Sequence, residues 1–494
     1  MKDKLAKGVA WLGAAKVIVN LLALGSTLIL ARLLTPEDFG LFSLALTMLT
    51  IISALTELSM ANALIHHKSP TDIHFNTAWT LNLSRALIIG IIFSISAPIM
   101  AQIYHEPRLT SIMLFLAVSI VMSGLNNPKM VLLTRDLVFW QEFALTVSQK
   151  FAGFIVGVAI ALIYKSYWAL VGGMIASQFV GIVISYIIIP FKPKFSFAHS
   201  KELWSFSIWL TFGQIVNTLN WKLDHLLIGS YLGVKSLGFY SVGDNLAGLP
   251  TRETIGPLQT TLFPGFKKIS DDNERLKAAY KSAQSLITAI VLPIGVGFAL
   301  IAHPMVLLVM GEKWLPIVQV IQVLSCVFAL QTLSSPVQPL AMSKGETKLL
   351  FKRDLFSFGM RVPIIVAGMF MGGLLGIIYA RAITGVIAIF INMHLVRRLI
   401  GTAISSQIAA NGRSLISILL MAICVLYLES ILGQGGAQLD LLFKIVALII
   451  FGALIYLSTH FILWIIAGRP QGPENEILKI VFKLIEKIRR VSNA

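Results

Sequence analysis

The sequence predicts an all-α polytopic membrane protein with about fourteen transmembrane helices. Of its 494 residues, 56% are hydrophobic and only 13% are charged, which is too apolar for a soluble protein of this length. Apolar runs of about 20 residues, the length needed to cross a bilayer, recur along the whole chain. No stretch between these runs exceeds roughly 25 residues, which is too short for a separate soluble domain.

Proline, glycine and charge clusters mark the boundaries of the apolar runs. The first run follows the basic segment Met1–Lys7, is longer than a signal-peptide core and lacks an A-x-A cleavage pattern, so we expect a retained span. The fourteen expected spans are 9–34, 39–64, 77–102, 110–133, 140–164, 168–190, 204–232, 236–263, 281–309, 315–340, 353–372, 374–396, 413–432 and 441–467.

The distribution of basic residues predicts the orientation. With a cytoplasmic N-terminus, the inner segments hold 27 Lys and Arg residues and the outer segments hold 6. Such an excess is typical of cytoplasmic segments, so both termini are expected to be cytoplasmic. Basic segments beside anionic lipid headgroups also account for most of the net charge of +17 without a nucleic-acid partner.

The stretch Trp204–Tyr240 repeats the beginning of the chain. One gapless register, which sets residue i beside residue i+198, pairs Trp11 with Trp209, Leu12 with Leu210, Leu34 with Leu232, Gly40 with Gly238, Phe42 with Tyr240 and Ser43 with Ser241. Both stretches start on the cytoplasmic side, which predicts two like-oriented six-helix bundles. The expected domains are 1–200 and 201–400 for the bundles, 401–470 for helices 13 and 14, and 471–494 for a cytoplasmic tail.

The tail has the pattern of an amphipathic helix. Its apolar and basic residues recur on different helical faces, which predicts a helix lying on the inner leaflet. The apolar residues are Ile477, Val481, Leu484, Ile488 and Val491, and the basic ones are Lys479, Lys483, Lys487 and Arg490.

Four stretches resemble a known group. They are ILARLLTPEDFGLFSL (29–44), LDHLLIGSYLGVKSLGFYSVGDNL (223–246), LFPGFKKISDDNERLKAAY (262–280) and VMGEKWLPIV (309–318). On these stretches the chain resembles the Wzx-type polysaccharide transporter branch of the multidrug/oligosaccharidyl-lipid/polysaccharide (MOP) flippase superfamily, and within it the colanic acid exporters. The resemblance covers roughly residues 5–400.

The resemblance implies a V-shaped, MATE-like pair of bundles whose central cavity opens alternately to the two membrane faces. The implied substrate is an undecaprenyl-diphosphate-linked oligosaccharide, exported across the bacterial inner membrane to polysaccharide polymerase machinery. Membrane lipids are the other expected partners. We expect a monomer without a cofactor, with H⁺ or Na⁺ as the coupling ion.

Seven basic residues fall within the expected spans. A charge at the bilayer centre costs on the order of 3 kcal/mol, so most of them should face a watery cavity, pair with an acid or reach an interface. They are Lys16, Arg85, Lys150, Lys222, Arg252, Arg361 and Arg381.

An anionic headgroup crossing a region of low dielectric constant needs cationic partners. We therefore hypothesise that some of Lys16, Arg85, Lys222 and Arg252 bind the diphosphate.

Helical spacing places several polar residues on shared faces, which predicts that they line a cavity. Hydrogen bonding between helices is the alternative. The stripes are Lys16 and Asn20; Asn82 and Arg85; Glu142, Thr146 and Lys150; Asn217, Asn220 and Asp224; and Asp244, Gly248 and Arg252.

Carboxylates within the spans are candidates for ion coupling. Glu57, Asp224 and Asp244 could exchange protons or bind Na⁺ during transport, as buried acids do in many transporters. The alternative is a static ion pair with Lys222, Arg252 or another base.

Enzyme signatures are absent from the sequence. It has no Walker A, H-E-x-x-H or G-x-S-x-G motif, and Cys326 and Cys424 lack the spacing of metal ligands. We therefore expect neither an enzyme nor a metal site. A glycosyltransferase or polymerase would need a larger extramembrane segment, whereas a small-molecule cation antiporter of the same superfamily remains the main alternative.

Glycine pairs with G-x-x-x-G spacing predict close helix packing. They are Gly153/Gly157, Gly368/Gly372 and Gly372/Gly376.

Overall fold

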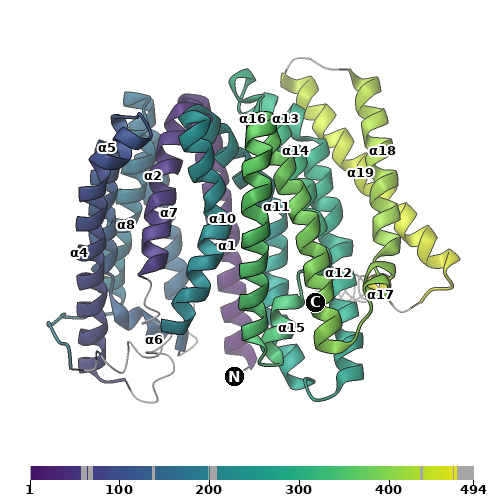
Figure 1. The fold of residues 1–494 in the computed structure, drawn as a ribbon, viewed down its shortest axis with the longest axis horizontal. Coiled ribbons are helices and arrows are strands. Elements are labelled where there is room, and N and C mark those ends of the chain that lie inside the picture. The colour runs from purple at the N-terminus through teal and green to yellow at the C-terminus, as the bar shows by residue number, and fades with distance from the viewer. Residues whose placement is uncertain are drawn as a thin grey trace, which may run out of the picture. The chain divides into compact units, whose positions relative to one another are not determined.

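The computed structural model describes residues 2–56, 64, 70–135, 140–198, 200, 208–433, 438–470 and 472–475. These residues are helical apart from short connections, and no strand occurs among them (Figure 1). A helix lies in each of the fourteen expected ranges, which confirms the all-α polytopic membrane fold. The amphipathic pattern at 477–491 lies outside the described residues.

The count of fourteen spans is approximate. Ten helices of the described ranges are long and apolar enough to cross a membrane. The helix Thr347–Ile400 is one of the ten but covers two expected spans, and the helix Arg108–Gly124 is apolar but shorter. The helices Ile208–Tyr231 and Gly233–Lys268 are long but more polar.

The chain divides into two compact units, Met1–Ser241 and Val242–Ala494. The boundary falls inside α11 (Gly233–Lys268), and α10 (Ile208–Tyr231) belongs to unit 1. The other helices of unit 1 are α1 (Lys2–Leu33), α2 (Pro36–Leu55), α4 (Asp72–Ile103), α5 (Arg108–Gly124), α6 (Val131–Arg135), α7 (Trp140–Tyr164) and α8 (Trp168–Ile188), with a 3₁₀ turn at Pro128–Met130. Unit 2 continues with α12 (Asn273–Leu300), α13 (Ala302–Val309), α14 (Ile317–Gln331), α15 (Val337–Ser343), α16 (Thr347–Ile400), α17 (Ile404–Ala409), α18 (Gly412–Leu432) and α19 (Gln438–Ile466), with 3₁₀ turns at Glu312–Trp314 and Thr332–Ser334.

Unit 1 is held together by pairs of closely packed helices. α4 lies along α5, α7 lies along α8, and α1 packs on α7 while α2 packs on α10. A Cβ atom at Gly153 would lie 2.8 Å from the Gly173 carbonyl oxygen, so glycine allows the backbones of α7 and α8 to touch. The close packing predicted from the Gly153/Gly157 spacing is therefore confirmed.

The beginnings of α2 and α11 cross at two glycines that the internal repeat had paired. A Cβ atom on Gly40 would lie 1.8 Å from the Val234 carbonyl oxygen, and one on Gly238 would lie 1.8 Å from that of Pro36. Pro36 and Val234 are themselves related by 198 positions. The contact is therefore reciprocal, as at an interface related by a two-fold axis.

An ion pair beside this crossing obeys the same symmetry. Glu37 and Lys235 are also 198 positions apart, and their Oε1 and Nζ atoms lie 3.5 Å from one another. Equivalent positions face each other near a two-fold axis, where two identical charges would repel. Because the first repeat has glutamate at this position and the second has lysine, the two side chains attract each other.

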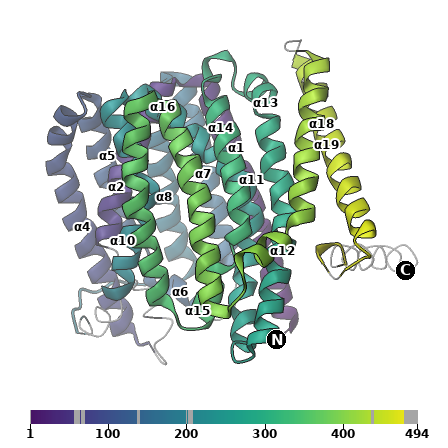
Figure 2. The ribbon, with the colours of Figure 1, turned by 45° about the vertical axis from the view of Figure 1, so that its right-hand side comes forward.

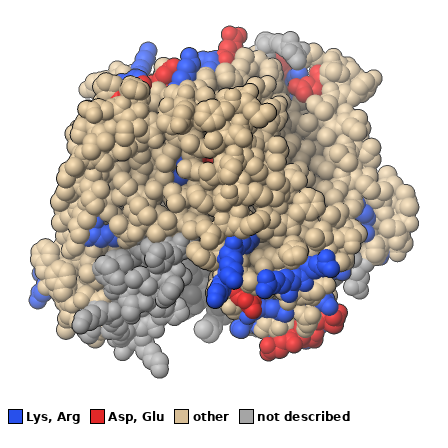
Figure 3. All heavy atoms as spheres, viewed as in Figure 1, with Lys and Arg blue, Asp and Glu red and all other residues tan. Residues whose placement is uncertain are grey.

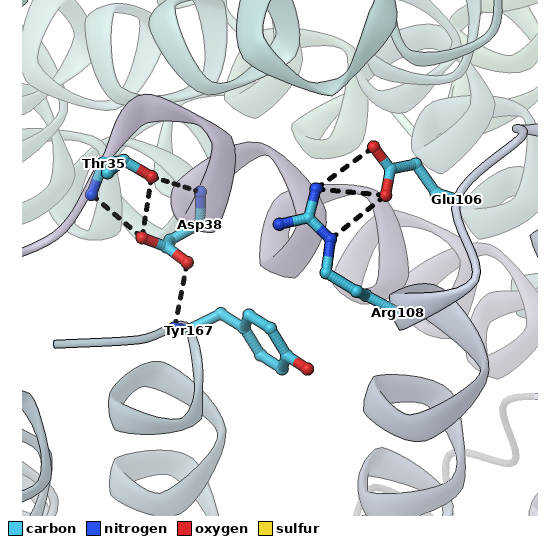
Figure 4. Close-up of polar contacts among 5 residues, drawn as sticks. All are labelled: Thr35, Asp38, Glu106, Arg108 and Tyr167. Carbon is cyan, nitrogen blue, oxygen red and sulfur yellow. Dashed lines mark hydrogen bonds and ion pairs between the residues drawn. The ribbon is translucent and has the colours of Figure 1, made fainter. Parts of the chain in front are cut away.

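The sequence Thr35–Asp38 explains where α2 begins. The Asp38 carboxylate accepts hydrogen bonds from the Thr35 backbone N–H (2.9 Å) and hydroxyl (2.7 Å), and Thr35 Oγ1 accepts from the Asp38 N–H, which forms a capping box (Figure 4). The other Asp38 oxygen accepts a hydrogen bond of 3.1 Å from the backbone N–H of Tyr167, where α8 begins. One carboxylate therefore ties together the starts of α2 and α8. Glu106 and Arg108, at the start of α5, form a separate ion pair of 3.1 Å.

In unit 2, the long α16 is interrupted at two glycines. Gly372 and Gly373 leave the helical conformation, and Gly373 has φ of 55°, a value that favours glycine. A Cβ atom at Gly376 would lie 1.8 Å from the Gly368 carbonyl oxygen, so the halves on either side of the break touch. The structure confirms the expected boundary between spans 353–372 and 374–396.

α18 and α19 lie side by side and pack into the apolar core of unit 2 (Figures 1 and 2). Met421 and Leu448 are buried against Leu292 of α12, and the Tyr456 hydroxyl donates a 2.9 Å hydrogen bond to the Ala289 carbonyl. Beyond α19, the fully buried Glu474 carboxylate accepts hydrogen bonds of 2.7 and 3.0 Å from Arg413. This pair ties residues 472–475 to the beginning of α18.

The surface agrees with a chain that spans a membrane. On the face drawn in Figure 3, charged side chains gather at the ends of the helices, and a broad band between them is nearly free of charge. Large exposed side chains such as Ile95, Ile187 and Phe370 belong to the apolar helices. Apolar side chains exposed at this density are suited to contact with lipid.

We expect Gly40→Ala or Gly238→Ala to destabilise the protein by about 2 kcal/mol, because the added carbon would overlap a backbone oxygen. Gly25→Ala in α1 is the matched control, since its Cβ would meet nothing within 4 Å. The measurement is the thermal unfolding midpoint in detergent micelles. Equal midpoints for all three variants would show that the crossing is not tight.

Candidate functional site

The candidate residues from the sequence are divided between the two units. Unit 2 contains Asp244 and Arg252, both on α11. Glu57 lies outside the described residues. The remaining candidates are in unit 1 and are Lys16, Asn20, Arg85, Asn217, Asn220, Lys222 and Asp224.

Asp224 is buried in the interior of unit 1. Its side chain is 0% exposed, and its Oδ2 atom accepts a 2.9 Å hydrogen bond from the hydroxyl of Tyr240, which is also fully buried. The His225 ring meets the Tyr240 ring edge-on, with centroids 5.4 Å apart. Asp224 therefore joins α10 to the start of α11, and Tyr240 is a partner that sequence reasoning missed. The signal was the repeat, which puts tyrosine where the first half has Phe42.

The rest of the α10 stripe is more open. Asn217 is exposed, whereas Asn220 and Lys222 are half-buried. The spacing placed Asn217, Asn220 and Asp224 on one face, but the two ends of that face have different surroundings. Asn217 is the exposed end of the stripe and Asp224 is its buried end.

Asp244 has a basic partner that lies far away in the sequence. Asp244 Oδ1 lies 3.6 Å from Nη2 of Arg381 on α16, and the Arg381 side chain is 5% exposed. The Arg381 guanidinium also lies over the Phe328 ring, 5.8 Å from its centroid. The structure thus pairs one of the carboxylates proposed for ion coupling with a base other than Lys222 or Arg252.

Arg85 and Arg252 both contact backbone oxygens. The Arg85 guanidinium donates hydrogen bonds to the Ser53 carbonyl (3.0 Å) and to the Thr56 hydroxyl (3.3 Å), where a cation favourably meets the C-terminal end of α2. Arg252 is exposed and donates a 3.1 Å hydrogen bond to the Asn245 carbonyl of its own helix. Of the two, Arg252 is more accessible to a bound anion.

Lys16 and Asn20 lie one turn apart on α1. Lys16 is exposed and Asn20 is half-buried. Their common face is consistent with the predicted stripe. Among the described residues, no group of three or more His, Cys, Asp and Glu side chains could hold a metal ion.

Residues 29–319 match the family described as polysaccharide biosynthesis protein. The chain belongs to this family. All four stretches quoted from the sequence lie within the matched residues, so the resemblance to Wzx-type members of the MOP superfamily is confirmed.

Two relatives illustrate the family. The chain is 26% identical over 385 residues to the lipopolysaccharide biosynthesis protein WzxC of Escherichia coli (strain K12), covering 76% of this chain and 77% of that protein. It is 24% identical over 433 residues to the succinoglycan biosynthesis transport protein ExoT of Rhizobium meliloti (strain 1021), covering 87% of each.

Solved structures show the same fold. The lipid II flippase MurJ, in an inward closed conformation, has a TM-score of 0.75 and 16% sequence identity, covering 91% of this chain and 98% of MurJ. An inward-facing multidrug resistance transporter of the MATE family has a TM-score of 0.59 and 12% identity, covering 78% of this chain and 96% of the transporter. The MOP-type fold predicted from the sequence is therefore confirmed.

We expect Arg381→Met to lower the free energy of unfolding by about 3 kcal/mol, because the Asp244 carboxylate would lose a buried partner. Asp244→Asn combined with Arg381→Met should cost less than the sum of the single changes. Arg397→Met, an exposed arginine on the same helix, is the control. Additive losses in detergent unfolding experiments would show that the two side chains do not interact.

Proposed function

We propose that this protein is a flippase that moves lipid-linked oligosaccharide repeat units across the bacterial inner membrane. The observation that carries the proposal is the family match over residues 29–319, in a chain whose fold resembles that of a lipid flippase along nearly all of its length. Two relatives are named for lipopolysaccharide biosynthesis and for succinoglycan biosynthesis transport, which supports a glycan substrate. An undecaprenyl-diphosphate carrier is the substrate class that we infer.

The proposed mechanism is alternating access between the cytoplasmic and periplasmic faces. Transporters of this kind are built from repeated bundles whose relative movement exposes one central site to either side. The internal repeat and the reciprocal contact of Gly40 with Gly238 support this origin. Both termini would lie in the cytoplasm, and the chain would act as a monomer that delivers its product to polysaccharide polymerase machinery.

Ion coupling is part of the same proposal. Asp224, Asp244 and Glu57 remain our candidates for binding H⁺ or Na⁺, because a carboxylate whose partner changes between conformations can bind and release a cation. The partners of Asp224 and Asp244, namely Tyr240 and Arg381, would then be exchanged during the cycle. No catalytic residue is involved in transport of this type.

A drug antiporter of the same superfamily is the second candidate. The MATE structure above has a lower TM-score than MurJ and covers less of the chain. The family match is to polysaccharide biosynthesis, which favours the glycan substrate.

Purified protein in vesicles should translocate an undecaprenyl-diphosphate-linked oligosaccharide and should not transport a cationic dye. The substrate is labelled on its glycan, and its exposure on the far leaflet is followed with and without H⁺ and Na⁺ gradients. Dye transport without glycan translocation would show that the protein is a drug antiporter and not a flippase. If neither gradient changes the rate of glycan translocation, the carboxylates have no role in ion coupling.

At least one of Lys16→Ala, Arg85→Ala, Lys222→Ala and Arg252→Ala should lower the export of surface polysaccharide about tenfold or more, because loss of one charge-assisted hydrogen bond to the diphosphate has that magnitude. Lys192→Ala, an exposed lysine after α8, is the control. The amount of folded protein in the membrane is measured for every variant. Normal export from all four variants would exclude them as diphosphate ligands.

A further inference from the structure

A partly open cavity of about 310 Å³ lies in unit 1, between α1, α2, α7 and α8. Its lining includes the polar side chains of Lys150, Ser177, Gln178 and Ser26. Gly153, Gly157 and Gly173 line the side where α7 and α8 touch. A volume of this size matches the lower end of small-molecule binding sites.

Lys150 lies near the middle of its membrane span. It is ten residues from the beginning of the 25-residue helix α7, or roughly 15 Å along an α-helix. A lysine at this depth is costly against lipid, and its side chain is too short to reach an interface from there. Lys150 is exposed and lines the cavity, and among the described residues it forms no ion pair.

Three polar side chains of the α7–α8 pair, Lys150, Ser177 and Gln178, line this cavity. The opposite side carries a separate groove lined by apolar residues, including Val156, Ile160 and Phe179. Helices that only met lipid on both sides would not need this asymmetry. The polar lining thus belongs to the side that holds Lys150, where residues of α1 and α2 also line the cavity.

Comparison of the two repeats shows why no acid lies beside Lys150 among the described lining residues. Ser26 and Phe42 line the cavity, and positions 198 residues later are Asp224 and Tyr240, which hydrogen-bond to each other. The first repeat thus has serine where the second has a buried aspartate. As a result, Lys150 is the one charged side chain among the described residues that line the cavity.

The chemistry of the lining selects a class of ligand. One ammonium group balances one negative charge, whereas diphosphates are usually held by several cations or by bidentate arginine. Gln178 and Ser177 can exchange hydrogen bonds with hydroxyl groups, and Phe42 and Phe154 offer aromatic surface to the C–H face of a sugar ring. A carboxylate-bearing sugar meets all three requirements.

We propose that this cavity is a subsite for an acidic sugar residue of the transported glycan, with Lys150 as the ligand of its carboxylate. The proposal rests on the proposed function for the source of the sugar, but the site itself is defined by unit 1 alone. It assigns recognition of the glycan to a place different from the four candidate diphosphate ligands.

The test is binding of glucuronic acid to the purified full-length protein, measured by saturation-transfer NMR, with glucose and inorganic phosphate as the comparison ligands. We expect glucuronic acid to bind in preference to both. Lys150→Gln should weaken its binding about tenfold or more, and Lys150→Arg should retain it, because only the latter keeps the charge. Lys192→Gln is the matched control for loss of a lysine outside the cavity.

A second variant tests the cavity without changing charge. Ser26→Phe should fill it from α1 and also abolish binding of glucuronic acid, while the unfolding midpoint reports whether the variant is folded. Equal binding of glucose and glucuronic acid, preference for phosphate, or undiminished binding by Lys150→Gln would each overturn the proposal. Glycan translocation by the unaltered protein is scored separately, so the flippase proposal can survive if this subsite fails.

Discussion

The crossing of α2 and α11 at Gly40 and Gly238 is the contact on which unit 1 depends. Each glycine packs against a backbone carbonyl of the other helix, and no other amino acid leaves that space. The crossing brings the start of α11 to α2, beside the ion pair of Glu37 and Lys235, and Tyr240 of the same helix reaches Asp224 of α10. Because the residues on the two sides are related by the internal repeat, the contact has the reciprocity of a symmetric dimer within one chain.

Four carboxylates of the described residues, three of them buried and one half-buried, have partners close at hand. Asp38 is bound by the starts of two helices, Asp224 by a tyrosine, Asp244 by an arginine and Glu474 by another arginine. In a membrane interior such partners reduce the cost of a charge, so each pair stabilises the fold as it stands. A coupling role for Asp224 or Asp244 therefore requires a conformation in which the partner moves away. This requirement links ion coupling to the movement of helices rather than to a fixed ion site.

Lys150 contrasts with these carboxylates. It lies in the middle of a span, faces a cavity with hydroxyl and amide groups, and has no acid beside it among the lining residues described. The two repeats differ at these positions, since one contains the pair Asp224 and Tyr240 and the other contains Ser26 and Phe42 beside an open space. The proposed sugar subsite and the buried pair Asp224 and Tyr240 therefore occupy equivalent places in the two repeats.

The sequence by itself determined the membrane-spanning helices, the close packing of Gly153 and the repeat that pairs Gly40 with Gly238, because hydropathy and glycine spacing are local properties. It also identified the family through stretches such as 29–44. Only the tertiary structure decided that Asp244 meets Arg381, 137 positions away, and that Asp224 is fully buried while Asn217 on the same stripe is exposed. Helical spacing shows which residues share a face, but the surroundings of that face depend on helices distant in the chain. For the same reason the stripe of Glu142, Thr146 and Lys150 could not reveal the cavity, which α1, α2 and α8 complete.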